Sequence, residues 1–199
     1  MPEAGPMPEA GPMPEPASIA AARPFLLGRQ VRLRPAEPSD APAFAAIFRD
    51  PSVATWWDAD DPDVEAREHA GSVDWDRAVW AIEAPGIASA ADSVVVGLIQ
   101  AYENADPQYR YAGIDLALSA AVQGRGLGPD AIRAVARWLF DERGHHRIVI
   151  DPAAANERAI RAYGSVGVRP VGVMRAYERG PDGTFHDGLL MEMLADELR

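Results

Sequence analysis

Gln123-Gly124-Arg125-Gly126-Leu127-Gly128 is the most informative part of the sequence, because it follows a predicted strand at 111–118 and opens a predicted helix at 126–142. A glycine turn here exposes backbone N–H groups, and the start of the helix adds roughly half a positive charge. Pro129 suits the first helical turn, where the helix does not use the missing N–H, although the same proline takes one donor away from a bound phosphate. The stretch therefore predicts a strand–turn–helix unit that binds a diphosphate.

Two other interpretations of this turn are a dinucleotide-binding fold and a purely structural turn. A dinucleotide fold places its glycine turn after the first strand and an acidic residue about 20 positions further on. Here the turn follows residue 120, and Asp141, which has the right offset, lies at the end of the same helix. These positions argue against NAD or nucleotide-sugar binding, whereas a structural turn stays open.

The rest of the chain predicts an α/β fold in which helices cover a mixed sheet. Ser39 and Asp40 are expected to cap the first helix, which ends near Asp50, and a loop carrying Trp56 and Trp57 follows it. Apolar periodicity predicts strands at 29–34, 78–83, 93–102, 111–118, 147–150, 171–178 and 185–194, and helices at 39–50, 62–74, 126–142 and 155–166.

Composition predicts one folded domain preceded by a tail. The 199 residues are 48% hydrophobic and 25% charged, which suits a single domain with its own core. Residues 1–18 read MPEAGP, MPEAGP, MPEPAS, a Pro/Gly/Ala-rich repeat that cannot bury a core. We therefore expect a disordered tail over 1–24 and one domain over 25–199. Without an apolar run of roughly 18–20 residues, the chain is expected to be cytoplasmic.

Charge and residue types exclude several classes of function. A net charge of −11 disfavours nucleic acid and anionic membranes as partners and favours small cations, although acidity also serves solubility alone. The absence of cysteine excludes thiolate nucleophiles and Cys-ligated zinc, and the 4 histidines lack the spacing of a helical metal pair. No metal is expected.

Two motifs resemble the GNAT acyltransferase superfamily. Residues 123–128 match its acyl-CoA signature, Gln/Arg-x-x-Gly-x-Gly/Ala, and Asn156-Glu-Arg-Ala-Ile-Arg-Ala-Tyr163 is similar to its Asn-x-x-Ala-x-x-x-Tyr helix. The resemblance implies a mostly antiparallel central sheet of about seven strands with helices on both faces, and acetyl-CoA as co-substrate. The cofactor-binding residues that it implies are Leu116, Leu118, Gln123, Gly124, Arg125, Gly126, Leu127, Gly128, Asn156 and Tyr163.

The same resemblance implies how the acyl group is transferred. Tyr163 would supply the proton for the leaving thiolate, and backbone N–H groups near Leu116 to Leu118, freed where two strands splay apart, would hold the thioester carbonyl. The alternative for Tyr163 is an aromatic side chain that merely packs on the sheet.

Three further stretches look like those of the aminoglycoside 6'-N-acetyltransferases: Gly113-Ile-Asp115-Leu, Ile150-Asp151-Pro152-Ala-Ala-Ala-Asn156 and the Trp56-Trp57 pair. On this resemblance Asp115 is the catalytic base, Asp151 binds a substrate ammonium, and Trp56 and Trp57 belong to the substrate loop. An Asp on an apolar strand is costly unless it is solvated or paired.

Each of these residues also has a structural alternative. Asp115 could form a salt bridge with Arg110 or Arg147, Asp151 could cap the turn that follows it, and the two tryptophans could cover the core. The acidic residues Asp58, Asp60, Asp61, Asp63 and Glu65 form a solvated face, which beside a pocket would attract a polycation.

The acceptor is the least determined part of the prediction. The leading expectation is a small cationic amine, best an aminoglycoside, and a monomer or homodimer. The alternatives are a protein N-terminus or ribosomal protein, succinyl-CoA as donor, and a non-catalytic CoA-binding module; the stretch 185–191 also resembles acyltransferases that modify protein N-termini. Gly164-Ser165-Val166-Gly167-Val168 departs from the usual Glu-Lys-x-Gly-Phe, which predicts looser packing after the tyrosine helix.

Overall fold

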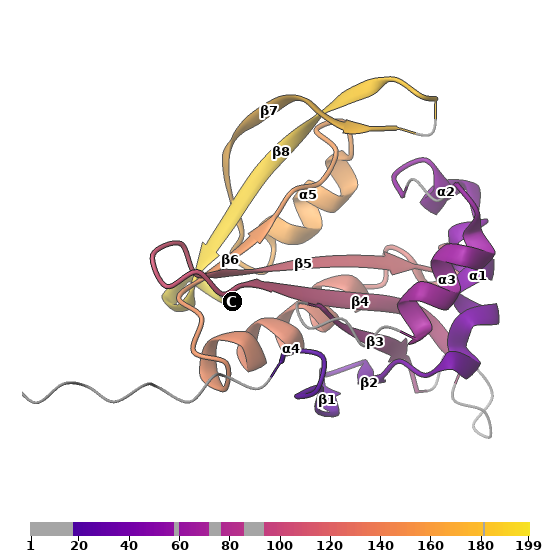
Figure 1. Ribbon diagram of the computed structural model, residues 1–199, viewed down its shortest axis with the longest axis horizontal. Helices are drawn as coiled ribbons and strands as arrows, with labels where there is room; N and C mark the ends of the chain where they lie inside the picture. The colour runs from indigo at the N-terminus through magenta and orange to yellow at the C-terminus, as the bar shows by residue number, and fades with distance from the viewer. Residues whose placement is uncertain (1–17, 58–59, 72–76, 86–93, 181) are drawn as a thin grey trace, which may run out of the picture.

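The computed structural model describes residues 18–57, 60–71, 77–85, 94–180 and 182–199, and these form one sheet with helices on both faces (Figure 1). The sheet has 8 strands in the order β1-β2-β3-β4-β5-β6-β8-β7, and every pair is antiparallel except β5 with β6. The strands are β1 (Leu26–Leu27), β2 (Arg32–Pro35), β3 (Arg77–Glu83), β4 (Val95–Asn104), β5 (Tyr111–Leu118), β6 (Arg147–Ile150), β7 (Arg169–Arg179) and β8 (Phe185–Leu194).

Two apolar clusters bury the two faces of this sheet. One face packs against the long helix α4, whose buried stripe includes Ile132, Val135 and Leu139, and the opposite face packs against Phe44 and Phe48 of α1. The α-helices are α1 (Ala41–Phe48), α2 (Pro51–Ala54), α3 (Pro62–Gly71), α4 (Leu127–Asp141) and α5 (Glu157–Gly164). The expected mixed, mostly antiparallel sheet with helices on both faces is confirmed.

Two short elements were not predicted. Strand β1 has only 2 residues, too few to show a periodic pattern, and it pairs with β2 through Leu26 and Leu33. Helix α2 occupies the start of the segment expected to be a loop, because Asp50 caps it by accepting a hydrogen bond from Ser52 N at 2.9 Å. This short helix sets the place of the two tryptophans that follow it.

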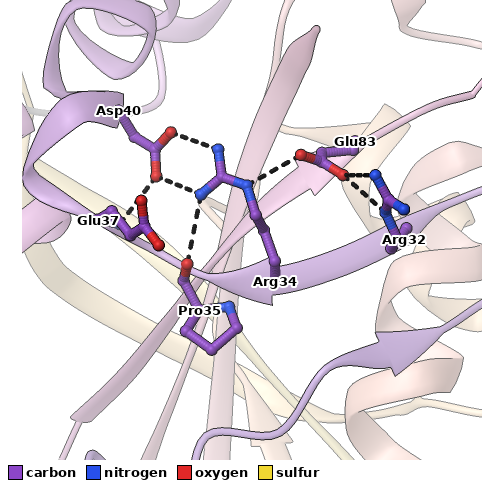
Figure 2. Close-up of polar contacts among 6 residues, drawn as sticks. All are labelled: Arg32, Arg34, Pro35, Glu37, Asp40 and Glu83. Atoms are coloured by element: carbon purple, nitrogen blue, oxygen red, sulfur yellow. Dashed lines mark hydrogen bonds and ion pairs between the residues drawn. The ribbon is translucent and has the colours of Figure 1, made fainter. Parts of the chain in front are cut away.

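Asp40 is the N-cap residue of the first helix, as expected, but its side chain makes no capping bond to that helix: it accepts from Glu37 N at 2.8 Å and binds an arginine. Arg34 of β2 donates through both terminal nitrogens to the Asp40 carboxylate, at 2.6 and 2.7 Å, and through Nε to Glu83 of β3 at 2.9 Å (Figure 2). Arg32 donates to the other oxygen of Glu83 at 2.8 Å. The network ties β2 to β3 and to the start of α1 with charge-assisted bonds.

The packed part of the chain begins before residue 25. Ile19 is fully buried in the core, and Trp80 Nε1 donates to the Pro24 carbonyl at 2.9 Å. The expectation of a disordered segment reaching residue 24 is therefore wrong for 18–24, while residues 1–17 lie outside the described part. Ile19 was overlooked because it stands alone after a Pro/Ala-rich repeat.

The sheet opens between its two parallel strands. Strands β5 and β6 pair only at Ala112 with Ile148 and at Gly113 with Val149. Beyond Gly113 the edge of β5 that faces β6 leaves the ladder, which confirms the splayed strand pair expected near Leu116 to Leu118. This opening positions the site described next.

Candidate active site

A pocket of about 920 Å³ lies at the opening between β5 and β6. Its walls come from both strands, from the turn before α4, from α5 and from the α2 region. Of the residues predicted to act on cofactor or substrate, all but Arg125 line it: Trp56, Trp57, Asp115, Leu116, Leu118, Gln123, Gly124, Gly126, Leu127, Gly128, Asn156 and Tyr163, with Asp151. Arg125 is exposed and does not belong to this lining.

The glycine turn offers unpaired donors to this pocket. Gly124 and Gly126 have φ of 77° and 82°, a backbone conformation that side-chain-bearing residues seldom adopt, and Gly126 is the N-cap of α4. The first N–H groups of an α-helix have no acceptor within that helix, and Gly126, Leu127 and Gly128 at the start of α4 line the pocket. Free amides at a helix start fit a diphosphate, and these residues would hold that part of acetyl-CoA.

Gln123 braces this turn against three other elements. Its Nε2 donates to the Leu118 carbonyl at 2.8 Å and to Ser52 Oγ at 3.3 Å, and its Oε1 accepts from Arg158 of α5. The side-chain amide is thus used within the protein. Sequence reasoning did not single out Arg158, which is the one cation that lines this pocket in the described structure.

Asp115 lies on the pocket wall in a partly buried position. Gln100 Nε2, its cross-strand neighbour on β4, donates to Asp115 Oδ2 at 3.1 Å. Burial, followed by the charge of Asp151, raises the pKa of Asp115 to about 6, although the Gln100 bond opposes both. A carboxylate with such a pKa is protonated and deprotonated near neutral pH, which suits a general base.

The two salt-bridge partners considered for Asp115, Arg110 and Arg147, bind other groups. Arg110 donates to the Arg143 carbonyl at 2.6 Å, and Arg147 binds Glu192 at 2.7 Å. Both arginines are thus paired with other groups, whereas the charge of Arg77 acts on Asp115 and favours its ionised form.

Gly113 has a steric reason for its place in the Gly-Ile-Asp stretch. A Cβ built on Gly113 would lie 1.9 Å from Cζ of Tyr102, its cross-strand neighbour, so only glycine leaves room for that ring. Tyr102 lines the pocket beside Asp115, and burial and the charge of Asp115 raise the pKa of its hydroxyl. The sequence did not point to this tyrosine, because the contact joins two strands.

Helix α5 carries Asn156 and Tyr163 along the pocket. Asn156 caps the helix, its Oδ1 accepting from Ala159 N at 3.1 Å. Tyr163 is 8% exposed, and burial, followed by the charges of Asp115 and Asp151, raises the pKa of its hydroxyl, which therefore keeps its proton. Packing after this helix is not loosened, because Val166 and Val168 are buried in the core.

Asp151 lies where β6 ends, opposite a tyrosine of the last hairpin. Tyr177 of β7 donates its hydroxyl to Asp151 Oδ2. Both residues line the pocket, as does Glu178. The capping role considered for Asp151 is replaced by this contact, and neither Tyr177 nor Glu178 was singled out from the sequence.

The two tryptophans differ in their surroundings. Trp57 packs against Phe48, with ring centroids 5.2 Å apart, and its Nε1 donates to Glu65 at 3.3 Å, whereas Trp56 is 38% exposed. Trp57 thus covers the core and lines the pocket at once. Glu65 joins the lining, while Asp61 caps α3 by accepting from Asp63 N at 2.9 Å. Asp58 lies outside the described residues.

Among the described residues, no helix is both long and apolar enough to cross a membrane. Nor do three or more His, Cys, Asp or Glu side chains of the described chain gather where they could hold a metal ion.

Curated relatives match part of the chain. A kanamycin resistance protein of Rhizobium radiobacter is 39% identical over 82 residues, covering 41% of this chain and 70% of the relative. An aminoglycoside N(6')-acetyltransferase type 1 of Klebsiella pneumoniae is 39% identical over 82 residues, covering 41% of this chain but only 38% of its own length.

Solved structures share the fold over most of the chain. Mycobacterium smegmatis RimJ in complex with CoA-disulfide has a TM-score of 0.71 at 22% identity, covering 88% of each chain. The ribosomal-protein-S5-alanine acetyltransferase of Vibrio fischeri has a TM-score of 0.70 at 17% identity, covering 88% of this chain and 99% of its own.

The family itself follows from a match over most of the chain. The model of the acetyltransferase (GNAT) domain matches residues 30–169, which include the glycine turn, the opened strand pair and the Asn-to-Tyr helix. Members of this family take the acyl group from acetyl-CoA, and the free amides of the turn fit it. The chain therefore belongs to the GNAT family and is an acyl-CoA-dependent N-acetyltransferase.

Proposed function

We propose that this enzyme acetylates a primary amine of a polycationic small molecule, and that the 6'-amine of an aminoglycoside is its leading acceptor. The partial match to a kanamycin resistance protein and to an aminoglycoside N(6')-acetyltransferase supports this acceptor class. The charge distribution within the pocket supports it independently.

The observation that carries the proposal is the separation of charge along the pocket. Among the described residues four carboxylates line it, and they come from different elements: Glu65 of α3, Asp115 of β5, Asp151 after β6 and Glu178 of β7. The lining cation Arg158 lies instead beside Gln123 at the glycine turn. An acceptor with several ammonium groups complements the first region, and the anionic diphosphate complements the second.

The residues of the pocket can support each proton transfer of the reaction. When bound, acetyl-CoA supplies the thioester whose acetyl group is transferred. Asp115 accepts the proton of the acceptor amine, whose nitrogen then attacks the carbonyl carbon. The β5 backbone near Leu116 to Leu118, freed from β6, stabilises the charge on the carbonyl oxygen. As the carbon–sulfur bond breaks, Tyr163 donates its proton to the leaving thiolate.

A protein or peptide amine is the second candidate. This chain shares its fold with the ribosomal-protein-S5-alanine acetyltransferase, and at 17% identity the similarity concerns the fold alone. The pocket carboxylates favour the polycation, because a peptide N-terminus brings one ammonium group to the site.

The test is a free-CoA release screen with acetyl-CoA and succinyl-CoA over kanamycin A, spermidine and N-terminal peptides. We expect turnover with acetyl-CoA and kanamycin A, and we expect Tyr163→Phe to lower kcat by about 10²-fold or more with little change in the KM for acetyl-CoA. Release of CoA with the peptides alone would exclude the polycationic acceptor and leave the protein-amine candidate.

A further inference from the structure

Strand β7 has an unusual backbone where it passes over the pocket. The pairing with β8 shifts register between Met174 and Glu178, and Ala176 has φ of 48°, the one positive φ of a non-glycine residue in the described chain. A side chain in this conformation is strained, and such strain persists only where the surroundings impose it. We call residues 174–178 the β7 bulge.

The surroundings of the β7 bulge impose that conformation. Ala176 N donates to Asp187 Oδ1 of β8 at 2.8 Å. At Gly188 a Cβ would lie 2.8 Å from Cδ1 of Tyr177, so the tyrosine ring rests where any other residue would collide with it. The strained backbone at Ala176 and the space left by Gly188 on the neighbouring strand therefore fix the position of the Tyr177 side chain.

The loop that carries Asp151 is attached to the same part of β8. Ala154 N donates to the Asp187 carbonyl at 2.8 Å, and Leu189 N donates to the Pro152 carbonyl at 2.8 Å. Asp187 thus contacts both the β7 bulge and the Asp151 loop. Strand β8 thus holds the β7 bulge next to the Asp151 loop, and Tyr177 of the bulge donates a hydrogen bond to Asp151 Oδ2.

The two aspartates occupy different surroundings in the pocket. Asp115 is bound by Gln100 on the sheet and shares the pocket with the buried Tyr163, where acyl transfer is proposed. Asp151 is bound by Tyr177, which is 48% exposed. With one Asp151 oxygen engaged by the tyrosine, the other remains for an ammonium group at the outer part of the pocket.

We propose that the β7 bulge makes Tyr177 a positioning residue that orients Asp151 to bind a second ammonium group of the acceptor, while Asp115 receives the reacting amine. This inference rests on the proposed function and names the residues that would bind the second ammonium group of its polycationic acceptor. It assigns to the last hairpin a role in choosing the acceptor, separate from the chemical step.

The experiment compares two acceptors, kanamycin A with several amino groups and 6-amino-6-deoxyglucose with one. Tyr177→Phe is expected to raise the KM for kanamycin A about tenfold, since an oriented bond to a charged group is lost, with kcat little changed. For the monoamine sugar kcat/KM is expected to stay within about twofold of the wild-type value. Tyr109→Phe, on an exposed loop outside the pocket, is the matched control.

Asp187 provides a second and independent variant. Asp187→Ala removes the acceptor of the Ala176 N–H and is expected to raise the KM for kanamycin A selectively, as Tyr177→Phe does. Asp187→Asn keeps an oxygen acceptor and is expected to have a KM close to that of the wild type. Thermal denaturation of each variant accompanies the kinetics, so that unfolding is separated from a change in KM.

The outcomes separate this inference from the proposed function. If the wild-type enzyme releases no CoA with kanamycin A, the proposed function is wrong and the inference with it. If the wild-type enzyme turns over kanamycin A but Tyr177→Phe behaves like it, only the inference is wrong. An equal loss with both acceptors would likewise overturn the second-ammonium role.

Discussion

Replacing Asp115 by asparagine is expected to stabilise the protein while removing its activity. The folded pocket raises the pKa of Asp115 from 3.8 to about 6, so the folded state binds its proton more tightly than the unfolded state does. The free energy of unfolding of the wild type therefore falls as pH rises between these two pKa values, and this loss of stability persists at higher pH. Below pH 3.8 both states are protonated and the cost disappears.

The size of the effect follows from that shift. Ionising Asp115 costs the folded state about 3 kcal/mol at pH 8 and about 2 kcal/mol at about pH 5.5. These are upper limits, because the residue is only partly buried and water screens its charge. The amide of the Asp115→Asn variant would keep the bond from Gln100 without this cost, so the gain in the free energy of unfolding approaches these values.

Urea denaturation of the wild type and Asp115→Asn at both pH values measures the gain, and CoA release measures turnover. We expect the larger gain at the higher pH and a loss of turnover of about 10²–10⁴-fold, the usual contribution of a general base. Asp141→Asn, on the exposed end of α4, is the control. A variant that is less stable than the wild type at the higher pH, or equally stabilised at every pH, would refute the argument that burial strains this carboxylate.

Two more substitutions test other parts of the structure. Arg158→Gln should weaken CoA binding about tenfold in calorimetry, because it removes the cation that lines the described pocket. Arg161, on the same helix and paired with Glu157, provides the control, and Arg161→Gln should leave the Kd for CoA unchanged. An equal loss of affinity in both variants would contradict a specific role for Arg158. Asp130→Ala should lower the free energy of unfolding by about 2–3 kcal/mol, because the N–H groups of residues 29–31 lose their acceptor, and an unchanged urea midpoint would show that water replaces it.

The local patterns were sufficient for most of the architecture. Alternation and helical periodicity located seven of the strands and the larger helices, and the glycine turn, Asn156 and Tyr163 all line the pocket. These features depend on neighbours a few positions apart, which periodicity and turn chemistry report directly. The roles of Asp115, Tyr163 and Asp151 remain predictions, although the structure brings all three to one pocket.

Features that depend on contacts between residues far apart in the chain could not be predicted from the sequence. In the connection between β1 and β2, three successive N–H groups bind Asp130, which is about 100 positions away, and Gly28 leaves no space for a Cβ beside that carboxylate. Asp40 has the residue type and position of a helix cap, yet Arg34 takes its carboxylate. In each case an apparently local signal was decided by a partner that sequence spacing does not reveal.

The family fold, the glycine turn before α4 and the positions of Asn156 and Tyr163 on one helix follow from residues that are close along the chain, so the sequence was enough to predict them. Which other side chains line the same pocket depends on how the strands pair. Tyr102 reaches the pocket because β4 pairs with β5 across Gly113, and Tyr177 reaches Asp151 because β8 holds the β7 bulge against the Asp151 loop. Strand pairing and packing bring such residues together across long separations, and no local pattern encodes those distances.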